Sequence, residues 1–413
     1  MTGCPYADLT APETFKGGLP RETFRQLREE QPVYWHEDPA QGRGFWTITR
    51  HRDLDYISKH PLLFSSELET CFLHEQDPAM MEMMRLQIIN MDPPRHIKYR
   101  RLVRNAFTPK KVDSYEQRFR EIAKGILDKA VQGGRCEFVE DIAAELPLIA
   151  ICELMGVPLD KRKRLFELTN IMIGMDDPEL ATSEEEGTMA MMEMFMMAQE
   201  LAAQNRANPQ DDIVDVLLHG TVEDEALTDD EFCYFFLLLI VAGNETTRTI
   251  TSHGMRLLME HDQYQQLADN PDLLEGAIEE FLRYNPAVIA FRRTATEDVE
   301  VGGQLIKKGD KIQMYYGAAS ADEELFKDSD NFDITRAQRE DVKNNHRAFG
   351  IGEHFCLGSH LARLELKVIF EEILARIRNP QFDGEINWLR SNFINGIKSM
   401  PIRFDAIESR STD

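Results

Sequence analysis

The chain of 413 residues lacks long apolar runs and paired cysteines. No stretch of about 20 apolar residues occurs, so no transmembrane helix is expected. The N-terminal segment has no basic region followed by an apolar run, so it does not resemble a secretion signal. Scattered cysteines without paired spacing argue against a disulfide framework or a zinc cluster. These cysteines are Cys4, Cys71, Cys136, Cys152, Cys233 and Cys356. We therefore expect a cytoplasmic protein without stable membrane insertion.

Basic residues are also scarce. The chain has 47 Lys and Arg against 72 Asp and Glu, a net charge of −25. Such an acidic surface opposes nucleic-acid binding and adhesion to anionic membranes, so no nucleic-acid partner is expected. The positive charge that exists is concentrated in one short segment, which could dock an acidic partner. The residues of this basic segment are Lys98, Arg100, Arg101, Arg104, Lys110 and Lys111.

The remaining pattern predicts a mainly α fold with a smaller β-rich portion, in a single domain over residues 1–413. No internal repeat or long linker divides the chain, and 42% hydrophobic residues suffice for a large core. Helical periodicity covers approximately residues 94–285 and 358–377. Alternating, turn-bounded segments predict the β-rich portion at approximately 30–65, 288–316 and 380–405, with a turn at Gly302 and Gly303.

One helix is predicted to be unusually long. Thr228 and Glu231 form a capping box at its start, and the pattern continues towards Glu260. Between Phe232 and Ala242 the residues are apolar on every side, so this helix is predicted to be buried all round. Its length fits a central helix that runs across a bound cofactor.

The most informative segment is Phe349-Gly-Ile-Gly-Glu-His-Phe-Cys-Leu-Gly358, which leads into the helix predicted at 359–377. A thiolate at a helix N-terminus is stabilised by the helix dipole and by free backbone N–H groups. Gly350, Gly352 and Gly358 leave room for a flat ligand over the backbone. These features are what a cysteine needs if it is to be the axial ligand of a haem iron. The alternative, an ordinary buried thiol, does not explain the surrounding pattern.

This pattern, F-x-x-G-x-[RH]-x-C-x-G, resembles the haem-binding loop of the cytochrome P450 family. The resemblance extends over essentially the whole chain. It implies the cytochrome P450 fold, with its long central helix across haem b (iron protoporphyrin IX) and Cys356 as the thiolate ligand. It also implies that Phe349, Gly350 and Gly358 bind the cofactor.

The segment Ala242-Gly243-Asn244-Glu245-Thr246-Thr247 resembles the family's oxygen-activation motif, A-G-x-[DE]-T-[TS]. That resemblance places Ala242 and Gly243 beside the cofactor and gives Thr246 and Glu245 catalytic roles in oxygen activation and proton delivery. A hydroxyl backed by a carboxylate is a minimal proton relay. Thr246 could also bond back to a carbonyl one turn earlier and open the helix locally. A capping or kink motif without chemistry is the alternative.

The resemblance implies two further sets of residues around the cofactor. One set would bind the haem propionates, which need cationic partners; it comprises His96, Arg100, Arg293 and His354. The charge of a histidine at position 354 depends on pH. The other set is structural and would hold the cysteine loop in place; it comprises Glu280, Arg283 and Arg336, with the first two at helical i,i+3 spacing.

The substrate pocket is expected to be apolar. Its predicted wall residues are Leu239, Val288, Ile289, Ala290, Phe291, Phe393 and Ile394. Methionines are concentrated in the insertion Glu67 to Asn90 and between Met172 and Met197, where they could form an adaptable lid. Core packing is the alternative for any one of them. The resemblance is strongest to bacterial enzymes that hydroxylate steroids, terpenoids or branched fatty lipids.

The resulting hypothesis is a haem-thiolate monooxygenase that inserts one atom of dioxygen into a C–H bond of a hydrophobic substrate. The chain is too short to carry its own reductase, so electrons would come from a ferredoxin and ferredoxin reductase. The ferredoxin would dock on Lys98, Arg101, Arg104 and Lys110. Three alternatives remain: a peroxide-driven enzyme, a haem-thiolate protein that only binds a ligand, and a helical scaffold without haem.

Overall fold

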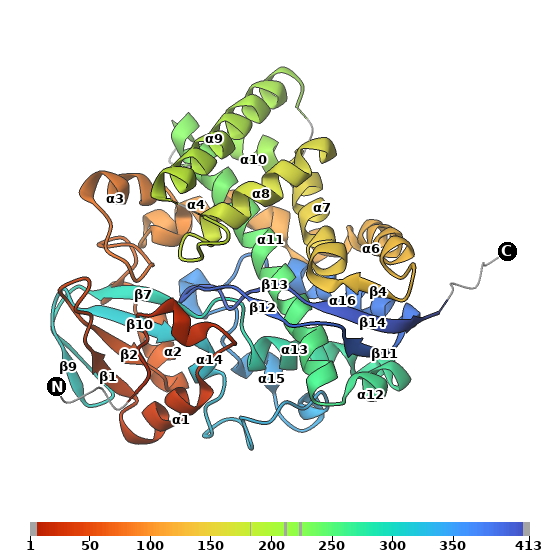
Figure 1. Cartoon of the computed structure of the whole chain (residues 1–413). Helices are drawn as coiled ribbons and strands as arrows, with labels where there is room; N and C mark the ends of the chain where they lie inside the picture. The colour runs from red at the N-terminus through yellow and green to blue at the C-terminus, as the bar shows by residue number, and fades with distance from the viewer. Residues whose placement is uncertain (1–5, 182, 210–212, 223–224, 408–413) are drawn as a thin grey trace.

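A computed structural model describes residues 6–181, 183–209, 213–222 and 225–407 of the chain (Figure 1); Cys4 lies outside these residues. The first helices are α1 (Arg21–Glu30), α2 (His51–Lys59), α3 (Pro78–Met84), α4 (Arg95–Arg104), α5 (Pro109–Asp113), α6 (Glu116–Ala130), α7 (Glu145–Leu154) and α8 (Arg162–Ile173). They are followed by α9 (Glu184–Ala207), α10 (Ile213–His219), α11 (Asp229–Glu260), α12 (Tyr264–Asp269), α13 (Leu274–Tyr284), α14 (Tyr316–Ala319), α15 (Val342–Asn345) and α16 (Ser359–Arg376). The predicted mainly α fold is confirmed.

Most strands lie in or next to the segments that the sequence predicts as β-rich, but β4 (Arg135–Glu137), β5 (Thr221–Val222) and β6 (Glu225–Ala226) lie inside the range 94–285 that it predicts as helical. The main sheet has the order β1-β2-β10-β7-β3, formed by β1 (Val33–His36), β2 (Phe45–Ile48), β10 (Lys311–Tyr315), β7 (Ala290–Ala295) and β3 (Phe64–Ser65). A second sheet has the order β11-β14-β4, formed by β11 (Ile377–Phe382), β14 (Pro401–Ala406) and β4 (Arg135–Glu137). The pattern does not predict β4, because this short strand forms by pairing with a segment more than 260 residues away, as in Ile402 opposite Cys136.

Three two-stranded sheets complete the β structure of the described residues. They pair β12 (Asn387–Trp388) with β13 (Ile397–Ser399), β5 (Thr221–Val222) with β6 (Glu225–Ala226), and β8 (Val299–Val301) with β9 (Gln304–Ile306). The turn between β8 and β9 is formed by Gly302 and Gly303, with φ of 55° and 81°. This left-handed conformation explains why glycine occupies both positions, and a Cβ on Gly302 would also lie 2.6 Å from the side chain of Val33.

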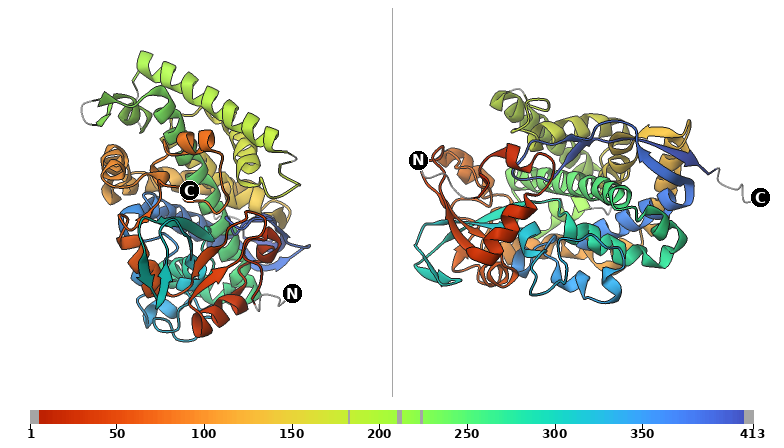
Figure 2. Two further views of the ribbon diagram at one scale, coloured as in Figure 1. Left: turned by 90° about the vertical axis from the view of Figure 1, so that its left-hand side faces the viewer. Right: turned by 60° about the horizontal axis from the view of Figure 1, so that its bottom comes forward.

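The long central helix is α11, which crosses the middle of the molecule (Figures 1 and 2). Thr228 and Glu231 form the predicted capping box, in which each side chain accepts a hydrogen bond from the other residue's backbone N–H, at 3.2 and 2.9 Å. Buried residues dominate from Phe232 to Ile240. The prediction of burial on every side is wrong, however, because the face at Leu239 and Ala242 opens onto a cavity.

The core of the helical portion is one large apolar cluster in which α11 packs against α7, α9, α13 and α16. A second cluster lies between the main sheet and α2, and a third joins the N-terminal segment and α1 to the same sheet. Within the described part of the chain, no helix combines the length and the apolar character needed to cross a membrane.

Candidate active site

Cys356 lies in the loop that precedes α16. The loop folds back on itself, since the N–H of Cys356 donates to the carbonyl of Phe349 at 2.9 Å. Gly350 and Gly352 have φ of 67° and 75°, a conformation that favours glycine. Gly352 has a second reason for lacking a side chain, because a Cβ there would lie 2.4 Å from the carbonyl oxygen of Ser58 in α2.

The predicted room for a flat ligand is therefore present only in part. Gly352 is needed for a backbone crossing with α2 and does not line the cavity. Gly350 and Gly358 do line it, and a Cβ on Gly358 would have no atom of the chain within 4 Å. The open side of the loop is thus the Gly358 end, next to Cys356.

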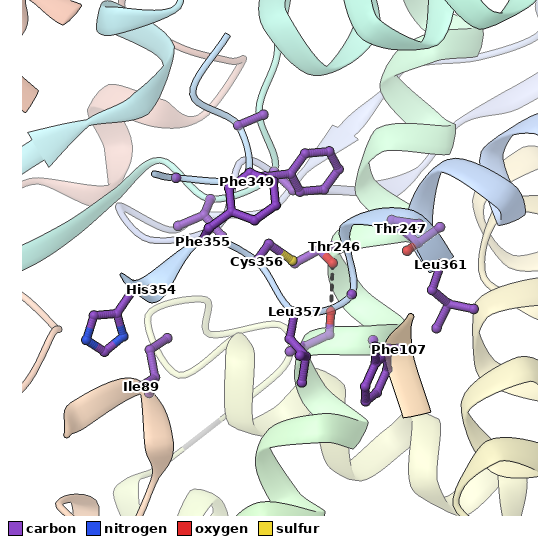
Figure 3. Close-up of a pocket in the computed structure, with 18 of the residues that line it drawn as sticks. Ile89, Phe107, Thr246, Thr247, Phe349, His354, Phe355, Cys356, Leu357 and Leu361 are labelled. Atoms are coloured by element: carbon purple, nitrogen blue, oxygen red, sulfur yellow. Dashed lines mark hydrogen bonds between the residues drawn. The ribbon is translucent and has the colours of Figure 1, made fainter. Parts of the chain in front are cut away.

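A cavity of about 260 Å³ lies between this loop and α11. Figure 3 shows the sulfur of Cys356 and the hydroxyl of Thr246 in its wall, together with several apolar side chains. The apolar wall residues include Ile88, Ile89, Phe107, Ile151, Leu239, Ile250, Val288, Phe291, Phe349, Leu357 and Leu361. A cavity of this composition suits an apolar ligand oriented by a few polar groups.

The α11 wall contains most of the residues predicted from the oxygen-activation motif. Leu239, Ala242, Gly243 and Thr246 line the cavity. The Thr246 hydroxyl donates to the Ala242 carbonyl oxygen at 2.7 Å, which is the back-bond expected from the sequence (Figure 3). The helix is not opened by this bond, because α11 continues without interruption from Asp229 to Glu260.

Glu245 does not line the cavity. Its carboxylate is buried and forms an ion pair with Arg248 in the next turn of α11. Arg248 in turn donates to the Asn170 side chain at 2.8 Å and lies over the Phe166 ring at 5.2 Å, both on α8. The structure therefore separates the predicted acid from the Thr246 hydroxyl, because an arginine at i,i+3 spacing is the nearer partner.

The four predicted propionate-binding residues meet at one edge of the cavity. The rings of His96 and His354 lie 4.1 Å apart, centroid to centroid. Arg100 donates to the backbone carbonyl of Phe355, and Arg293 donates to that of Arg292 at 2.7 Å. No acidic side chain in the described wall lies among them; its one carboxylate, Glu365, belongs to α16. An edge rich in donors and without a counter-ion fits a ligand that carries carboxylates.

The two histidines are held neutral at this edge. Burial and the neighbouring Arg100 and Arg293 lower the pKa of His96 to about 4. Burial, Arg293, His96 and Arg100 likewise lower the pKa of His354 well below its usual value. The change in charge of His354 with pH therefore lies well below neutral pH. The two arginines supply the positive charge.

The thiol of Cys356 has two opposing influences on its pKa. Burial raises the pKa, while the Gly358 N–H, Arg100 and Arg363 lower it in part. A coordinating cation deprotonates a thiol outright. The sulfur in the wall, the open backbone at Gly358 and the donor edge, whose two arginines have no carboxylate partner among the described residues, together fit a haem with its two propionates.

The structural set is brought together as the resemblance implies. Arg283 makes two hydrogen bonds to the Glu280 carboxylate, at 2.6 and 2.8 Å, and Arg336 makes a third at 3.2 Å. All three side chains are buried. The guanidinium groups also donate to the carbonyl oxygens of Ser320, Ser329, Lys327, Asp328 and Asn331. The network thus fixes the chain that leads towards the cysteine loop.

Part of the predicted pocket wall is misplaced. Val288 and Phe291 line the cavity, but Ile289 and Ala290 do not. Ile289 is buried between the tail and the sheet, where its N–H donates to the Phe393 carbonyl at 2.9 Å and its carbonyl accepts from Tyr316 at 3.1 Å. Ala290 pairs with Tyr315 in the sheet and faces the third apolar cluster.

The tail residues Phe393 and Ile394 also lie outside the cavity wall. The ring of Phe393 packs against Phe72 and Phe291, with centroids 5.1 and 5.6 Å apart. Ile394 is buried and forms a β-bridge with Val288. Both residues therefore support wall residues from behind.

The predicted methionine lid does not line the cavity either. No methionine occurs in its described wall. Met189, Met192 and Met196 on α9 have exposed fractions of 66, 57 and 63%, whereas Met194 on the opposite face is fully buried in the core. The alternative of core packing holds for the inner methionines, and the cavity obtains its apolar character from isoleucine, leucine and phenylalanine.

Several wall residues were missed by the sequence-based prediction. Ile88 and Ile89 come from the end of the insertion before α4, Phe107 follows α4, and Ile151 belongs to α7. Glu365 on α16 had a recognisable signal. It shares the helix face of Leu361 and Ile369, so an acidic residue interrupts an otherwise apolar stripe.

A sequence profile described as "Cytochrome P450" matches residues 267–379. The chain is 35% identical to linalool 8-monooxygenase of Pseudomonas putida over 96% of this chain and 98% of that protein. It is 36% identical to steroid C26-monooxygenase of Rhodococcus jostii, over 96% and 84%. A Mycobacterium marinum cytochrome P450 solved in complex with pseudoionone matches the structure with a TM-score of 0.88 at 35% identity, over 98% of this chain and all of that one.

Proposed function

The chain belongs to the cytochrome P450 family, as a monooxygenase, and on that premise we propose that it hydroxylates a branched, apolar isoprenoid with electrons from a ferredoxin. The observation that carries the proposal is the cavity whose apolar wall has the Cys356 sulfur on one side and the Thr246 hydroxyl on another. The substrate class covers terpenoids and steroids.

Two observations support this class of substrate. Relatives are named for linalool and for steroids, and a solved relative holds pseudoionone; all three compounds are branched isoprenoids. The cavity wall of this chain supplies aliphatic and aromatic carbon and few polar groups. Binding against an apolar wall is stabilised by about 25 cal/mol of free energy for each Å² of apolar ligand surface that leaves water. This contribution does not select for hydrogen-bonding groups.

The family implies haem as the cofactor, and the residues fit it. Cys356 would be the axial ligand, and Arg100 and Arg293, with His96 and His354 beside them, would bind the propionates. When bound, a thiolate-ligated haem supplies the activation of dioxygen for insertion into a C–H bond. Ala242 and Gly243 would border the cofactor from the α11 side. A Cβ on Gly243 would lie 3.0 Å from the Ile151 side chain of α7, so glycine at this position allows α11 and α7 to pack closely.

We assign the reaction's proton handling to α11. The Thr246 hydroxyl reaches the cavity, and its bond to the Ala242 carbonyl fixes the direction of its lone pairs. Glu245 would support proton delivery after leaving its ion pair with Arg248. A positioned hydroxyl and carboxyl group contribute about 10² to 10⁴ to a rate.

A ferredoxin would dock on the outer face of α4 and on α5. Arg101, Arg104 and Lys110 are exposed and form no ion pair with another described residue. The inner face of α4 reaches the cysteine loop through the bond from Arg100 to Phe355. An acidic protein bound to this basic face would thus lie one helix away from Cys356, and charge complementarity would speed the encounter.

A spectral binding screen tests the substrate class. Terpenoids, steroids and branched fatty acids, added to the haem-loaded protein, are expected to shift the Soret band at micromolar concentrations. If all of these fail while small aromatics or sugars succeed, the proposed substrate class is wrong. Product formed with hydrogen peroxide, and none with a ferredoxin system, would instead favour the peroxide-driven alternative.

Reduction kinetics test the docking face. Reversing the charge with Arg104→Glu is expected to slow reduction by ferredoxin at low salt. Added salt should narrow the difference in reduction rate between the variant and the wild type. Lys308→Glu is the matched control, because it makes the same charge change beside the β8–β9 hairpin. Equal slowing by both variants would indicate a general charge effect and contradict docking on α4.

A further inference from the structure

Three methionines form a stripe on the outer face of α9. Met189, Met192 and Met196 follow one another at spacings of three and four residues, so their side chains share one face of the helix. Each of them is more than half exposed to solvent. Met194, on the opposite face, is fully buried in the helical core. The same helix therefore holds methionine in two contrasting surroundings.

The stripe lies at the periphery of the molecule, where α9 is the outermost helix (Figures 1 and 2). Two acidic side chains of α9 are engaged towards α8, since Glu193 forms an ion pair with Arg164 and Glu200 one with Lys161, at 2.6 Å each. Met175, in the segment before α9, is also more than half exposed. This part of the surface therefore presents several thioether sulfurs to solvent.

An apolar stripe on an exposed helix face calls for an explanation, because such a face normally carries polar residues. Methionine differs from the isoleucine and leucine of the cavity wall in one chemical property, which is that its thioether sulfur is readily oxidised to a sulfoxide. The oxidant must reach the sulfur, so exposure decides which methionines react. The stripe combines this chemistry with open access.

We propose that the outer face of α9 is a site of reversible methionine oxidation, at which hydrogen peroxide converts Met189, Met192 and Met196 to sulfoxides. In each reaction a lone pair of the sulfur attacks one oxygen of the peroxide, and the O–O bond breaks. The sulfur loses two electrons and keeps that oxygen, and the second oxygen leaves as water with both protons. A sulfoxide reductase with a dithiol reverses the change, because the sulfoxide oxygen then leaves as water and the dithiol becomes a disulfide.

The proposed monooxygenase function supplies the oxidant. Two electrons from the ferredoxin and two protons reduce dioxygen to hydrogen peroxide in each turnover that inserts no oxygen atom into a substrate. This source rests on the proposed function. The site itself rests on the exposure of the three sulfurs, and it would react equally with peroxide from outside the protein.

Oxidation of the stripe should leave the cavity unchanged, because no methionine of the described chain lines the cavity wall. Each sulfoxide adds a polar oxygen that solvent can hydrate, so the outer face of α9 changes from apolar to polar. Met194 is the opposite case. A sulfoxide there would bring an unpartnered polar oxygen into the core, at a cost in stability.

Peptide mapping by mass spectrometry tests the site on the haem-loaded protein. In millimolar hydrogen peroxide, the three methionines of the stripe are expected to gain one oxygen atom each at least about tenfold faster than Met194. The triple variant Met189→Leu, Met192→Leu and Met196→Leu should lose this fast uptake and keep the carbon monoxide spectrum, since leucine is a good helix former. Met83→Leu, at an exposed position of α3, is the matched control and should keep the fast uptake. Oxidation of Met194 as fast as that of the stripe would overturn the inference.

Turnover without substrate separates the site from the source of the peroxide. Ferredoxin, its reductase and dioxygen should produce the same three sulfoxides, and catalase should prevent them by removing hydrogen peroxide. A sulfoxide reductase with dithiothreitol should then restore the original peptide masses; sulfoxides that persist would contradict the reversibility. If added peroxide oxidises the stripe but the ferredoxin system produces no peroxide and no product, the proposed function fails and the oxidation site stands.

Discussion

The loop side of the cavity is braced by buried ion pairs and hydrogen bonds, whereas the opposite walls consist of apolar side chains held by packing contacts. On the loop side, Arg363 lies 4.6 Å over the Phe349 ring and donates to Glu279, which also contacts His346 at 2.9 Å. On the other side, the ring of Phe291 packs against the rings of Phe393 and Phe72. Directional contacts specify one geometry, while apolar contacts accept several.

This difference matches what each side of the cavity has to bind. A metal ligand must be held within a fraction of an ångström, and the loop supplies that through charge-assisted bonds. A pocket for a flexible hydrocarbon needs volume and apolar surface more than fixed directions. Substitutions on the loop side should therefore have severe and specific effects on cofactor binding and stability. Substitutions on the apolar side should have graded effects on ligand binding.

Cys356→Ser should have the largest effect. Serine cannot supply a thiolate, so the reduced carbon monoxide complex should lose the red-shifted Soret band of thiolate-ligated haem, and activity should fall below detection. Cys152→Ser is the control, because this thiol is buried in the helical core and does not line the cavity. If Cys356→Ser keeps the red-shifted band, another residue is the ligand and the assignment of the loop side fails.

Glu280→Gln should have the next largest effect, on stability. The change leaves the guanidinium groups of Arg283 and Arg336 buried without their carboxylate, at a cost of about 3–5 kcal/mol in the free energy of unfolding. Denaturant unfolding and haem retention measure this cost. Glu275→Gln, exposed on the same helix, should change the stability by about 0.5 kcal/mol or less. Equal effects would show that the network does not brace the loop.

The same i,i+3 spacing occurs in two Glu–Arg pairs of this chain, one that the sequence-based prediction used and one that it did not. Glu280 and Arg283 form an i,i+3 pair that the motif identifies, and the structure contains it. Glu245 and Arg248 have the same spacing, yet the oxygen-activation motif gave Glu245 a place beside Thr246. Local spacing therefore held the information for both pairs. The partner that Glu245 takes depends on tertiary structure, because Arg248 lies on the side of α11 that faces α8.

The rest of the site depends on contacts between distant segments. The long helices, the capping box and the glycine-rich loop follow from local patterns of turns, caps and periodicity, whereas strand pairings such as β4 with β14 do not. The positions of Ile289 and Phe393 do not, because they are fixed by a bond between residues more than 100 positions apart. Such a register is set by tertiary packing, which overrides what a short apolar run suggests.

Thr246→Ala should have an intermediate effect, on coupling. Removal of the hydroxyl should let electron consumption continue while product falls roughly tenfold, since proton delivery to the cavity is impaired. Thr251→Ala is a matched control: its hydroxyl makes the same kind of back-bond, to Thr247 at 2.9 Å, outside the cavity wall. If the control is equally uncoupled, the loss reflects the helix and not the position of the Thr246 hydroxyl.

Substitutions of the exposed methionines should have the smallest effect. Met192→Leu and Met196→Leu change side chains on the outer face of α9, which do not line the cavity. Spectral dissociation constants for terpenoids and steroids should therefore change less than about twofold, equivalent to roughly 0.4 kcal/mol. Phe291→Ala, in the cavity wall, should weaken the same ligands about tenfold or more because it removes a buried aromatic contact. A large effect of the methionine variants would mean that α9 turns its outer face towards the substrate during binding, and the apolar side would then be a moving lid and not a fixed wall.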